Sequence, residues 1–281
     1  MKVTLLGTGS PESYARRASS GYLVDIAGDV LQFDCGGGSV SRLLEAGRKP
    51  NEISRLFFSH LHSDHMMDYA RLVHASWDEG GALEVFGPAP IAQITERLFG
   101  PKGAFETDLR ARTEFEPSKE IWLERGGTLP RAWPEATVEE ILPGFSMRGD
   151  GWQLRSVEVP HAQPFLDCLG YRIDADGKAV VYSGDSGTSD ALTKLATGAD
   201  ILIHMCFNLS QEARGPDWLK GSSGHLEVAH TAEEASVGKV VLTHLRPHMD
   251  APGVHLRLVK EMSEIYCGEI VIGEDLMDFE L

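Results

Sequence analysis

Residues 60–65, with the sequence His-Leu-His-Ser-Asp-His, place four metal-binding side chains within six positions. The apolar residues 56–58 precede this segment and predict a buried strand, and residues 66–79 after it predict a helix. A tight loop that carries three imidazoles and a carboxylate is costly to bury unless a metal ion collects those side chains. The segment therefore predicts a metal site at the end of a strand.

The four side chains of this loop divide between two ions. His60 and His62 are two residues apart, so in an extended chain they point the same way and can reach one metal. Asp64 and His65 follow the turn and can reach a second ion, about 3.5–4 Å from the first, as in two-metal hydrolases. Two ions need more ligands than this loop supplies, so the others have to come from elsewhere in the chain.

The ends of other predicted strands supply candidates for the missing ligands. His161, Asp185 and His244 each stand just past an apolar run. Ligands at the ends of rigid strands are well held. Each of these residues alone is more often a cap or a hydrogen-bonded core residue, but together with residues 60–65 they favour a shared metal site.

The order of apolar segments predicts an α/β protein. Predicted strands lie at 3–7, 21–26, 30–34, 54–59, 83–86, 152–158, 169–174, 179–183, 200–204, 239–243 and 269–273, and predicted helices at 39–46, 66–79, 89–99, 189–196, 226–236 and 254–265. Strand clusters in both halves predict two packed sheets covered by helices. Residues 101–150, rich in proline, are interpreted as an irregular insertion within a single domain of residues 1–281.

Composition limits the kinds of partner that the chain is expected to bind. Lysine and arginine number 26 and aspartate and glutamate 42, giving a net charge of −16 that opposes binding to a polyanion. No apolar stretch reaches the roughly 20 residues that span a membrane. Residues 1–6 read as part of a strand and not as a signal peptide, and the four cysteines are far apart, so we expect a cytoplasmic protein with reduced cysteines.

Several segments resemble one known fold family. Residues 60–65, the Gly-Asp-Ser of 184–186 and the Leu-Thr-His of 242–244 look like the metallo-β-lactamase fold of dinuclear zinc hydrolases. Segments 4–11, 33–36, 168–173 and 182–185 are similar to its ribonuclease Z and arylsulfatase-like branch. The resemblance covers nearly the whole chain apart from residues 101–150. It implies an αββα sandwich, with two mixed β-sheets packed face to face and helices on the outside.

The resemblance also implies a role for the seven candidate ligands. They would coordinate two zinc ions: His60, His62 and His161 at the first, Asp64, His65 and His244 at the second, and Asp185 between the two. Imidazole-rich sites suit zinc, with manganese as an alternative occupant. Such a pair of ions would generate a bridging hydroxide that attacks an ester, with Asp64 also orienting it.

His225 is the candidate proton donor for the leaving group. It stands between a glycine-serine loop and the helix predicted at 226–236. The ribonuclease Z branch carries its catalytic histidine in a Gly-His-Ser at this place, and here Leu226 replaces the serine. The alternative interpretation is an exposed histidine in the cap region of the helix.

Two features favour a small substrate over transfer RNA. His161 and Asp185 are only 24 positions apart, which leaves no room for the transfer-RNA-binding arm that ribonuclease Z enzymes with such an arm carry there. Residues 101–140 hold nine acidic and six basic residues, a balance that opposes phosphate binding. Nucleic acid is therefore not the expected partner.

The first interpretation is a dinuclear zinc hydrolase of a small anionic or aromatic ester, with a sulfate ester or phosphodiester favoured. Residues 104–112 look like the arylsulfatase-like members. Trp122, Trp133 and Phe105 would line an apolar pocket over the zinc site, where Arg110 or Arg112 would hold an anion. The alternatives are a ribonuclease Z-like endonuclease for transfer-RNA 3′ ends, a lactonase, and a non-enzymatic zinc-binding scaffold. A homodimer is expected by analogy alone.

Overall fold

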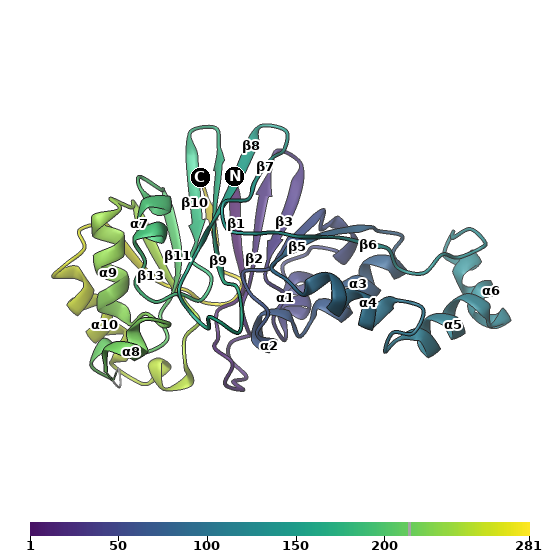
Figure 1. The fold of residues 1–281 in the computed structure, drawn as a ribbon, viewed down its shortest axis with the longest axis horizontal. Coiled ribbons are helices and arrows are strands. Elements are labelled where there is room, and N and C mark those ends of the chain that lie inside the picture. The colour runs from purple at the N-terminus through teal and green to yellow at the C-terminus, as the bar shows by residue number, and fades with distance from the viewer. Residues whose placement is uncertain (213–214) are drawn as a thin grey trace.

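Two mixed β-sheets lie face to face at the centre of the computed structural model, which describes residues 1–212 and 215–281 (Figure 1). Within these residues each sheet has seven strands, in the orders β14-β1-β2-β3-β4-β5-β6 and β13-β12-β11-β10-β9-β8-β7. The first sheet comprises β1 Lys2–Gly7, β2 Gly21–Ile26, β3 Asp29–Phe33, β4 Arg55–Phe57, β5 Leu83–Gly87, β6 Ala136–Glu140 and β14 Asp278–Glu280. The second comprises β7 Ser146–Arg148, β8 Trp152–Glu158, β9 Leu169–Ala175, β10 Lys178–Tyr182, β11 Ile201–Met205, β12 Lys239–Thr243 and β13 Glu269–Ile272.

Aromatic side chains fill the space between the two sheets. Phe33 and Phe57 stack with ring centroids 5.3 Å apart, and Tyr171 of the second sheet packs edge-on against Phe57 at 5.9 Å. These rings are buried and belong to one apolar cluster that includes strands of both sheets. The inward-facing positions of the strands thus hold the two layers together.

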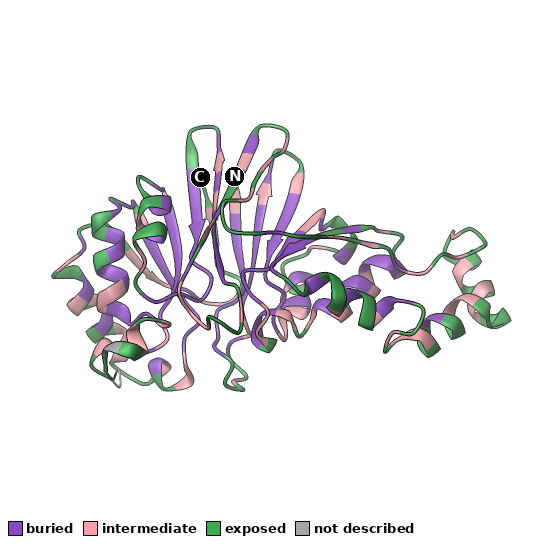
Figure 2. Cartoon of the chain, viewed as in Figure 1, coloured by how far each residue is buried: buried purple, intermediate pink, exposed green. Residues whose placement is uncertain are grey.

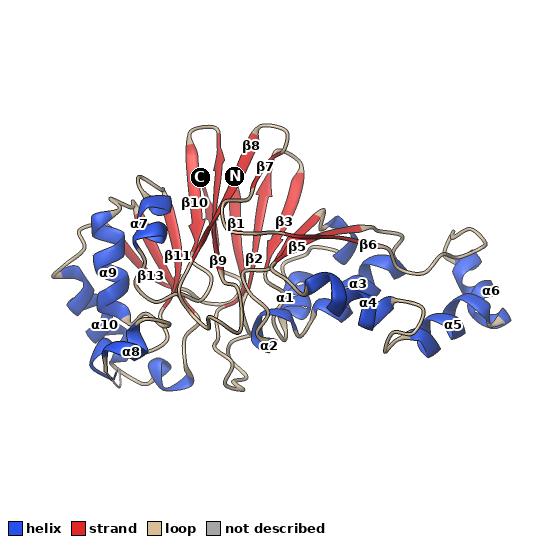
Figure 3. Ribbon diagram, in the orientation of Figure 1, coloured by secondary structure: helices blue, strands red, loops and turns tan. Residues whose placement is uncertain are grey.

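Helices cover the outer face of each sheet (Figure 3). The helices are α1 Ser39–Glu45, α2 Ser63–Met66, α3 Tyr69–Asp78, α4 Ile91–Phe99, α5 Glu106–Glu114, α6 Glu116–Glu124, α7 Asp190–Ala196, α8 Pro216–Leu219, α9 His225–Glu234 and α10 Val254–Ser263. In Figure 1, α1, α3 and α4 lie on the side of the first sheet and α7, α9 and α10 on that of the second. This arrangement confirms the predicted αββα sandwich. Among the described residues, no helix is long and apolar enough to cross a membrane.

The segment 101–150 is not irregular, and that prediction is wrong. It contains α5 and α6, followed by β6, which pairs in parallel with β5, and β7, which pairs antiparallel with β8. Helices α5 and α6 form an arm that extends away from the sheets, and much of the arm is exposed (Figures 1 and 2). Each of the two strands therefore completes an edge of one sheet, and only the helical arm projects from the fold.

Arg131, in the segment that follows the arm, packs against helix α3 of the first layer. The Arg131 guanidinium lies between two indole rings, 3.6 Å from the Trp77 centroid and 4.1 Å from that of Trp122. It also donates to Asp78 Oδ1 at 2.7 Å. Because Trp77 and Asp78 belong to α3, these contacts connect the end of the arm to a helix of the first layer.

Candidate metal centre

The seven candidate ligands come together where strands of both sheets end. His60 and His62 follow β4, and α2 carries Asp64 and His65 directly after them. Three strands of the second sheet supply the others, because His161 follows β8, Asp185 follows β10 and His244 follows β12. Strands β8, β10 and β12 run in the same direction, so their carboxyl ends lie at one edge of that sheet. The sequence-predicted ligands are therefore neighbours in space, in two groups.

Three histidines form the first group. Nε2 of His60 lies 3.0 Å from Nδ1 of His62, and Nε2 of His161 lies 3.2 Å from that same nitrogen. Burial, together with the charges of neighbouring histidines, lowers the pKa of His60 well below its ordinary value and also lowers the pKa of His62. Both rings are thus favoured in the neutral form, which is the form that binds a metal.

Two carboxylates and two histidines form the second group. Nε2 of His244 lies 3.1 Å from Asp64 Oδ2 and 3.1 Å from Asp185 Oδ2. Nε2 of His65 lies 3.4 Å from one oxygen of each of the same carboxylates. His161 Nε2 is 3.6 Å from Asp185 Oδ2, so Asp185 stands between the two groups.

The charges of the second group suit a cation. Burial opposes ionisation of Asp185, but His244 and His65 outweigh it and hold its pKa well below the ordinary value. Burial likewise lowers the pKa of His244, yet the Asp185 carboxylate raises it to about 9. The carboxylates thus draw positive charge into a buried space. Nε2 of His65 is buried there without a hydrogen-bond partner, as expected for an atom placed to bind a metal. The residues therefore fit a divalent metal centre.

Asp34, which the sequence analysis did not single out, orients one of these histidines. It stands after β3 with a φ of 56° and is fully buried. Its carboxylate accepts hydrogen bonds from His65 Nδ1 at 2.8 Å, from the Tyr182 hydroxyl at 2.6 Å and from the Ser59 backbone N–H at 2.7 Å. With its Nδ1 donating to Asp34, His65 presents Nε2 to the metal centre. The available signal was a lone aspartate just past an apolar strand, the same signal that identified Asp185.

Replacing Asp34 with asparagine is expected to weaken zinc binding by about 10–100-fold, the usual effect of losing a residue that orients a ligand. An asparagine has the same shape, but its amide nitrogen cannot accept the hydrogen bonds that Asp34 receives. Competition with a chelating indicator dye measures the affinity. Asp25→Asn in β2 is the matched control, since Asp25 pairs with Arg48 away from the centre. Equal zinc affinity of the two variants would refute an orienting role for Asp34.

His225 is buried at the start of α9, and its ring contacts none of the seven ligands through a hydrogen bond or ion pair. Its Nδ1 accepts from the Ser210 backbone N–H at 3.1 Å, and its Nε2 donates to Glu261 Oε2 at 2.7 Å. The histidine is therefore not the exposed residue of the alternative interpretation. Its role as a proton donor stays a prediction.

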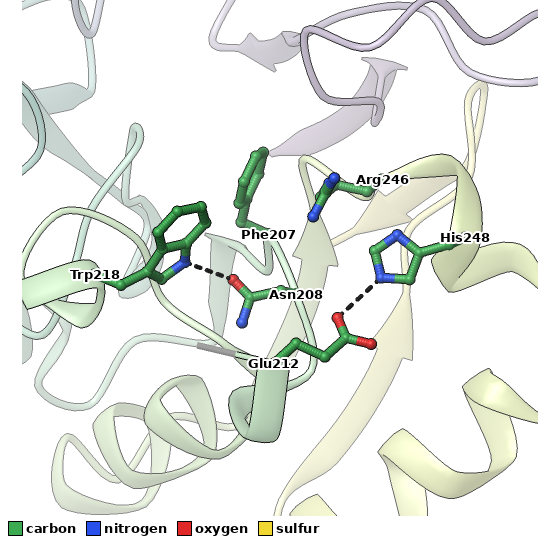
Figure 4. Close-up of a pocket in the computed structure, with 6 residues that line it drawn as sticks. All are labelled: Phe207, Asn208, Glu212, Trp218, Arg246 and His248. Carbon is green, nitrogen blue, oxygen red and sulfur yellow. Dashed lines mark hydrogen bonds and ion pairs between the residues drawn. The ribbon is translucent and has the colours of Figure 1, made fainter. Parts of the chain in front are cut away.

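Two cavities open beside the metal centre. One, of about 380 Å³, is lined by Phe207, Asn208, Glu212, Trp218, Arg246 and His248 (Figure 4). The other, of about 390 Å³, shares Phe207 and Trp218 with the first and reaches His161. The Phe207 ring also lies 5.6 Å from that of His244. The walls of the cleft next to the ligands are thus aromatic.

The residues predicted to form a substrate pocket over the metal site do not line the cavities beside it, so that prediction is wrong. Arg110 and Arg112 form ion pairs within α5 itself. Trp122 and Trp133 line a separate cavity of about 300 Å³ that none of the seven ligands lines. The sequence placed these side chains over the metal site because it gave no indication that the helices project outward (Figure 1).

Comparison with known proteins supports the resemblance found in the sequence. A model of the beta-lactamase superfamily domain matches residues 31–245. Ribonuclease Z of Mycobacterium sp. (strain KMS) is 32% identical over 290 residues, covering 100% of this chain and 96% of that protein. Ribonuclease Z of Mycobacterium bovis (strain BCG / Pasteur 1173P2) is 30% identical and covers 100% and 98%.

Solved structures share the fold over the whole chain. The metallo-beta-lactamase fold protein YhfI from Bacillus subtilis superposes with a TM-score of 0.76 at 25% identity, covering 100% of this chain and 98% of that one. The short form of human tRNase Z gives a TM-score of 0.70 at 19% identity and covers 100% and 99%. At that identity the second likeness concerns the fold alone.

Proposed function

Because this chain belongs to the beta-lactamase superfamily, we propose that it hydrolyses phosphodiester bonds in RNA in the manner of ribonuclease Z. The chain is a metal-dependent hydrolase acting on ester bonds, so the alternative of a non-enzymatic scaffold is wrong. The observation that carries the proposal is the convergence of seven candidate ligands, from the ends of four strands and from helix α2, into two adjoining groups. Such a pair of groups suits in-line cleavage of a phosphate ester.

Each of the seven candidate ligands, and His225 as the proton donor, has a proposed role. The first zinc ion would be held by His60, His62 and His161, the second by Asp64, His65 and His244, and Asp185 would contact both. Two bound zinc ions, or manganese in their place, would supply an acidified water and neutralise charge on the phosphate. Asp64 would orient the attacking water. His225 would protonate the leaving oxygen, for which its Nε2 has to exchange Glu261 for the substrate.

The relatives support the ribonuclease Z alternative better than the small sulfate ester that the sequence analysis ranked first. Proteins named ribonuclease Z align with this chain from end to end. We therefore propose a phosphodiester bond of RNA as the bond that is cleaved. Between His161 and Asp185 the chain has only β9, β10 and short loops, so no projecting arm lies there. We therefore infer that RNA is recognised at the cleft beside the metal centre.

A panel of substrates tests this function. Zinc-loaded protein is expected to cleave a precursor transfer RNA with a 3′ trailer and bis(p-nitrophenyl) phosphate, with kcat/KM at least about tenfold above that for p-nitrophenyl sulfate or a lactone, because both preferred substrates are phosphodiesters. Chromatography of the RNA products and release of nitrophenol give the rates. Efficient cleavage of the sulfate ester alone would contradict the proposal and restore the first interpretation.

The same substrates test whether His225 is a proton donor, because one of the two diesters has a leaving group that needs no proton. A His225→Ala variant is expected to lose more activity on the RNA, whose leaving oxygen is a poor one, than on the nitrophenyl diester, whose leaving group needs no proton. His230→Ala, at an exposed position of the same helix, is the matched control. Equal losses on both diesters would argue against proton donation by His225.

A further inference from the structure

We propose that Phe207 and Trp218 form a subsite that stacks the nucleobase adjoining the scissile phosphodiester. This inference rests on the proposed phosphodiester hydrolysis and names the part of the substrate that the cleft selects. The two rings line both cavities beside the metal centre, with centroids 6.3 Å apart and planes inclined by 36°. His161 lines one of these cavities, and the His244 ring lies next to that of Phe207. The phosphate attached to a base held against the two rings would therefore lie beside these histidines.

The aromatic walls are fixed in place by their neighbours. The Trp218 indole N–H donates to Asn208 Oδ1 at 3.1 Å, and the buried Asn208 in turn donates to the Leu209 carbonyl at 2.8 Å. The Arg246 guanidinium lies 5.0 Å from the Phe207 ring centroid. Figure 4 shows Phe207 between Trp218 on one side and Arg246 on the other. Rings that are held in place and line a cavity lose little conformational entropy when a base packs against them.

The charges around the cleft favour a neutral ring over a chain of phosphates. Arg246 is bound by the Glu12 carboxylate, with a shortest contact of 2.7 Å, and His248 pairs with Glu212 at 3.0 Å. These two basic side chains are thus already balanced by carboxylates. With these cations paired, the cleft is better suited to a base of an RNA substrate than to its phosphates. The cavities, about 380 and 390 Å³, fall within the range of small-ligand pockets and suit one base with its sugar.

Two phosphodiesters with the same leaving group test the subsite. Thymidine 5′-(p-nitrophenyl phosphate) carries a base, and methyl p-nitrophenyl phosphate does not. In zinc-loaded protein, Trp218→Ala is expected to lower the ratio of kcat/KM for the thymidine ester to that for the methyl ester by about 5–150-fold, the effect of losing one stacked base. Trp218→Phe keeps an aromatic ring and should retain most of the ratio. Trp133→Ala is the matched control, because the Trp133 indole donates to Thr113 of the arm and does not line the cleft.

Calorimetric titration with thymidine 5′-monophosphate separates this inference from the proposed function. If neither diester is cleaved but Trp218→Ala weakens nucleotide binding and Trp133→Ala does not, phosphodiester hydrolysis fails and the base subsite stands. If the diesters are cleaved with a ratio that Trp218→Ala leaves unchanged, the subsite is overturned while the proposed function survives. Unchanged nucleotide binding in the Trp218→Ala protein would also overturn it.

Discussion

Replacing Asp185 with alanine is expected to abolish hydrolysis and to release bound metal, while the fold is kept. Asp185 is buried, and its carboxylate lies within 3.6 Å of nitrogen atoms of His65, His161 and His244. It therefore lies next to candidate ligands of both groups. The loss of activity should exceed the roughly hundredfold effect of removing a residue that only orients a ligand. Hydrolysis of bis(p-nitrophenyl) phosphate and metal content by mass spectrometry measure the two effects.

Two further variants make this result specific. Asp185→Asn keeps the size of the side chain but removes the negative charge, so it should also lose metal if charge is what binds the ions. Asp190→Ala, at the exposed start of α7, is the control for the loss of a carboxylate. Circular dichroism checks that all three proteins fold. An Asp185→Ala protein that retained two ions per chain and full activity would refute the assigned centre.

The candidate ligands outside residues 60–65 could be singled out from the sequence because each follows an apolar strand. An apolar run followed by one polar metal-binding residue is a local pattern, visible at His161, Asp185 and His244 without knowledge of the fold. Strand boundaries were less exact. The strand expected at 54–59 ends at Phe57, because the Ser59 backbone N–H donates to the Asp34 carboxylate instead of extending the sheet. A side chain distant in sequence thus decides where β4 ends and the segment leading to residues 60–65 begins.

Features formed by exposed or distant residues escaped prediction for a physical reason. Strands β6 and β7 are sheet edges of five and three residues with no fully buried side chain, so the alternation of apolar and polar residues in their sequences is too short and too weakly apolar to mark a strand. Helix α6 buries no residue and shows no clear apolar stripe. The aromatic cleft joins Phe207, Trp218 and Arg246 from separate loops and a short helix, and only the folded chain brings them together.

Replacing Gly36 with alanine is expected to displace residues 60–65 and to destabilise the protein. Gly36 follows β3, and a Cβ atom there would overlap the Asp64 carbonyl oxygen and lie 2.8 Å from Ser19 Cβ. The adjacent Cys35 N–H donates to the His65 carbonyl at 2.7 Å, so this turn holds the two candidate ligands of α2 in position. Because backbone cannot yield as a flexible side chain does, we expect a cost of about 1–3 kcal/mol or more. Thermal unfolding and zinc titration measure the loss of stability and of metal affinity.

The next residue offers the control, because a Cβ atom on Gly37 would meet nothing nearer than Met67 Cβ at 3.8 Å, an ordinary contact. Gly37→Ala should therefore keep both stability and zinc affinity close to those of the unaltered protein. The difference between the two neighbouring variants isolates the contact of Gly36 with Asp64 from any general effect of adding a methyl group to this turn. If Gly36→Ala bound zinc as tightly as Gly37→Ala, the packing of β3 against the loop would not determine the position of Asp64 and His65.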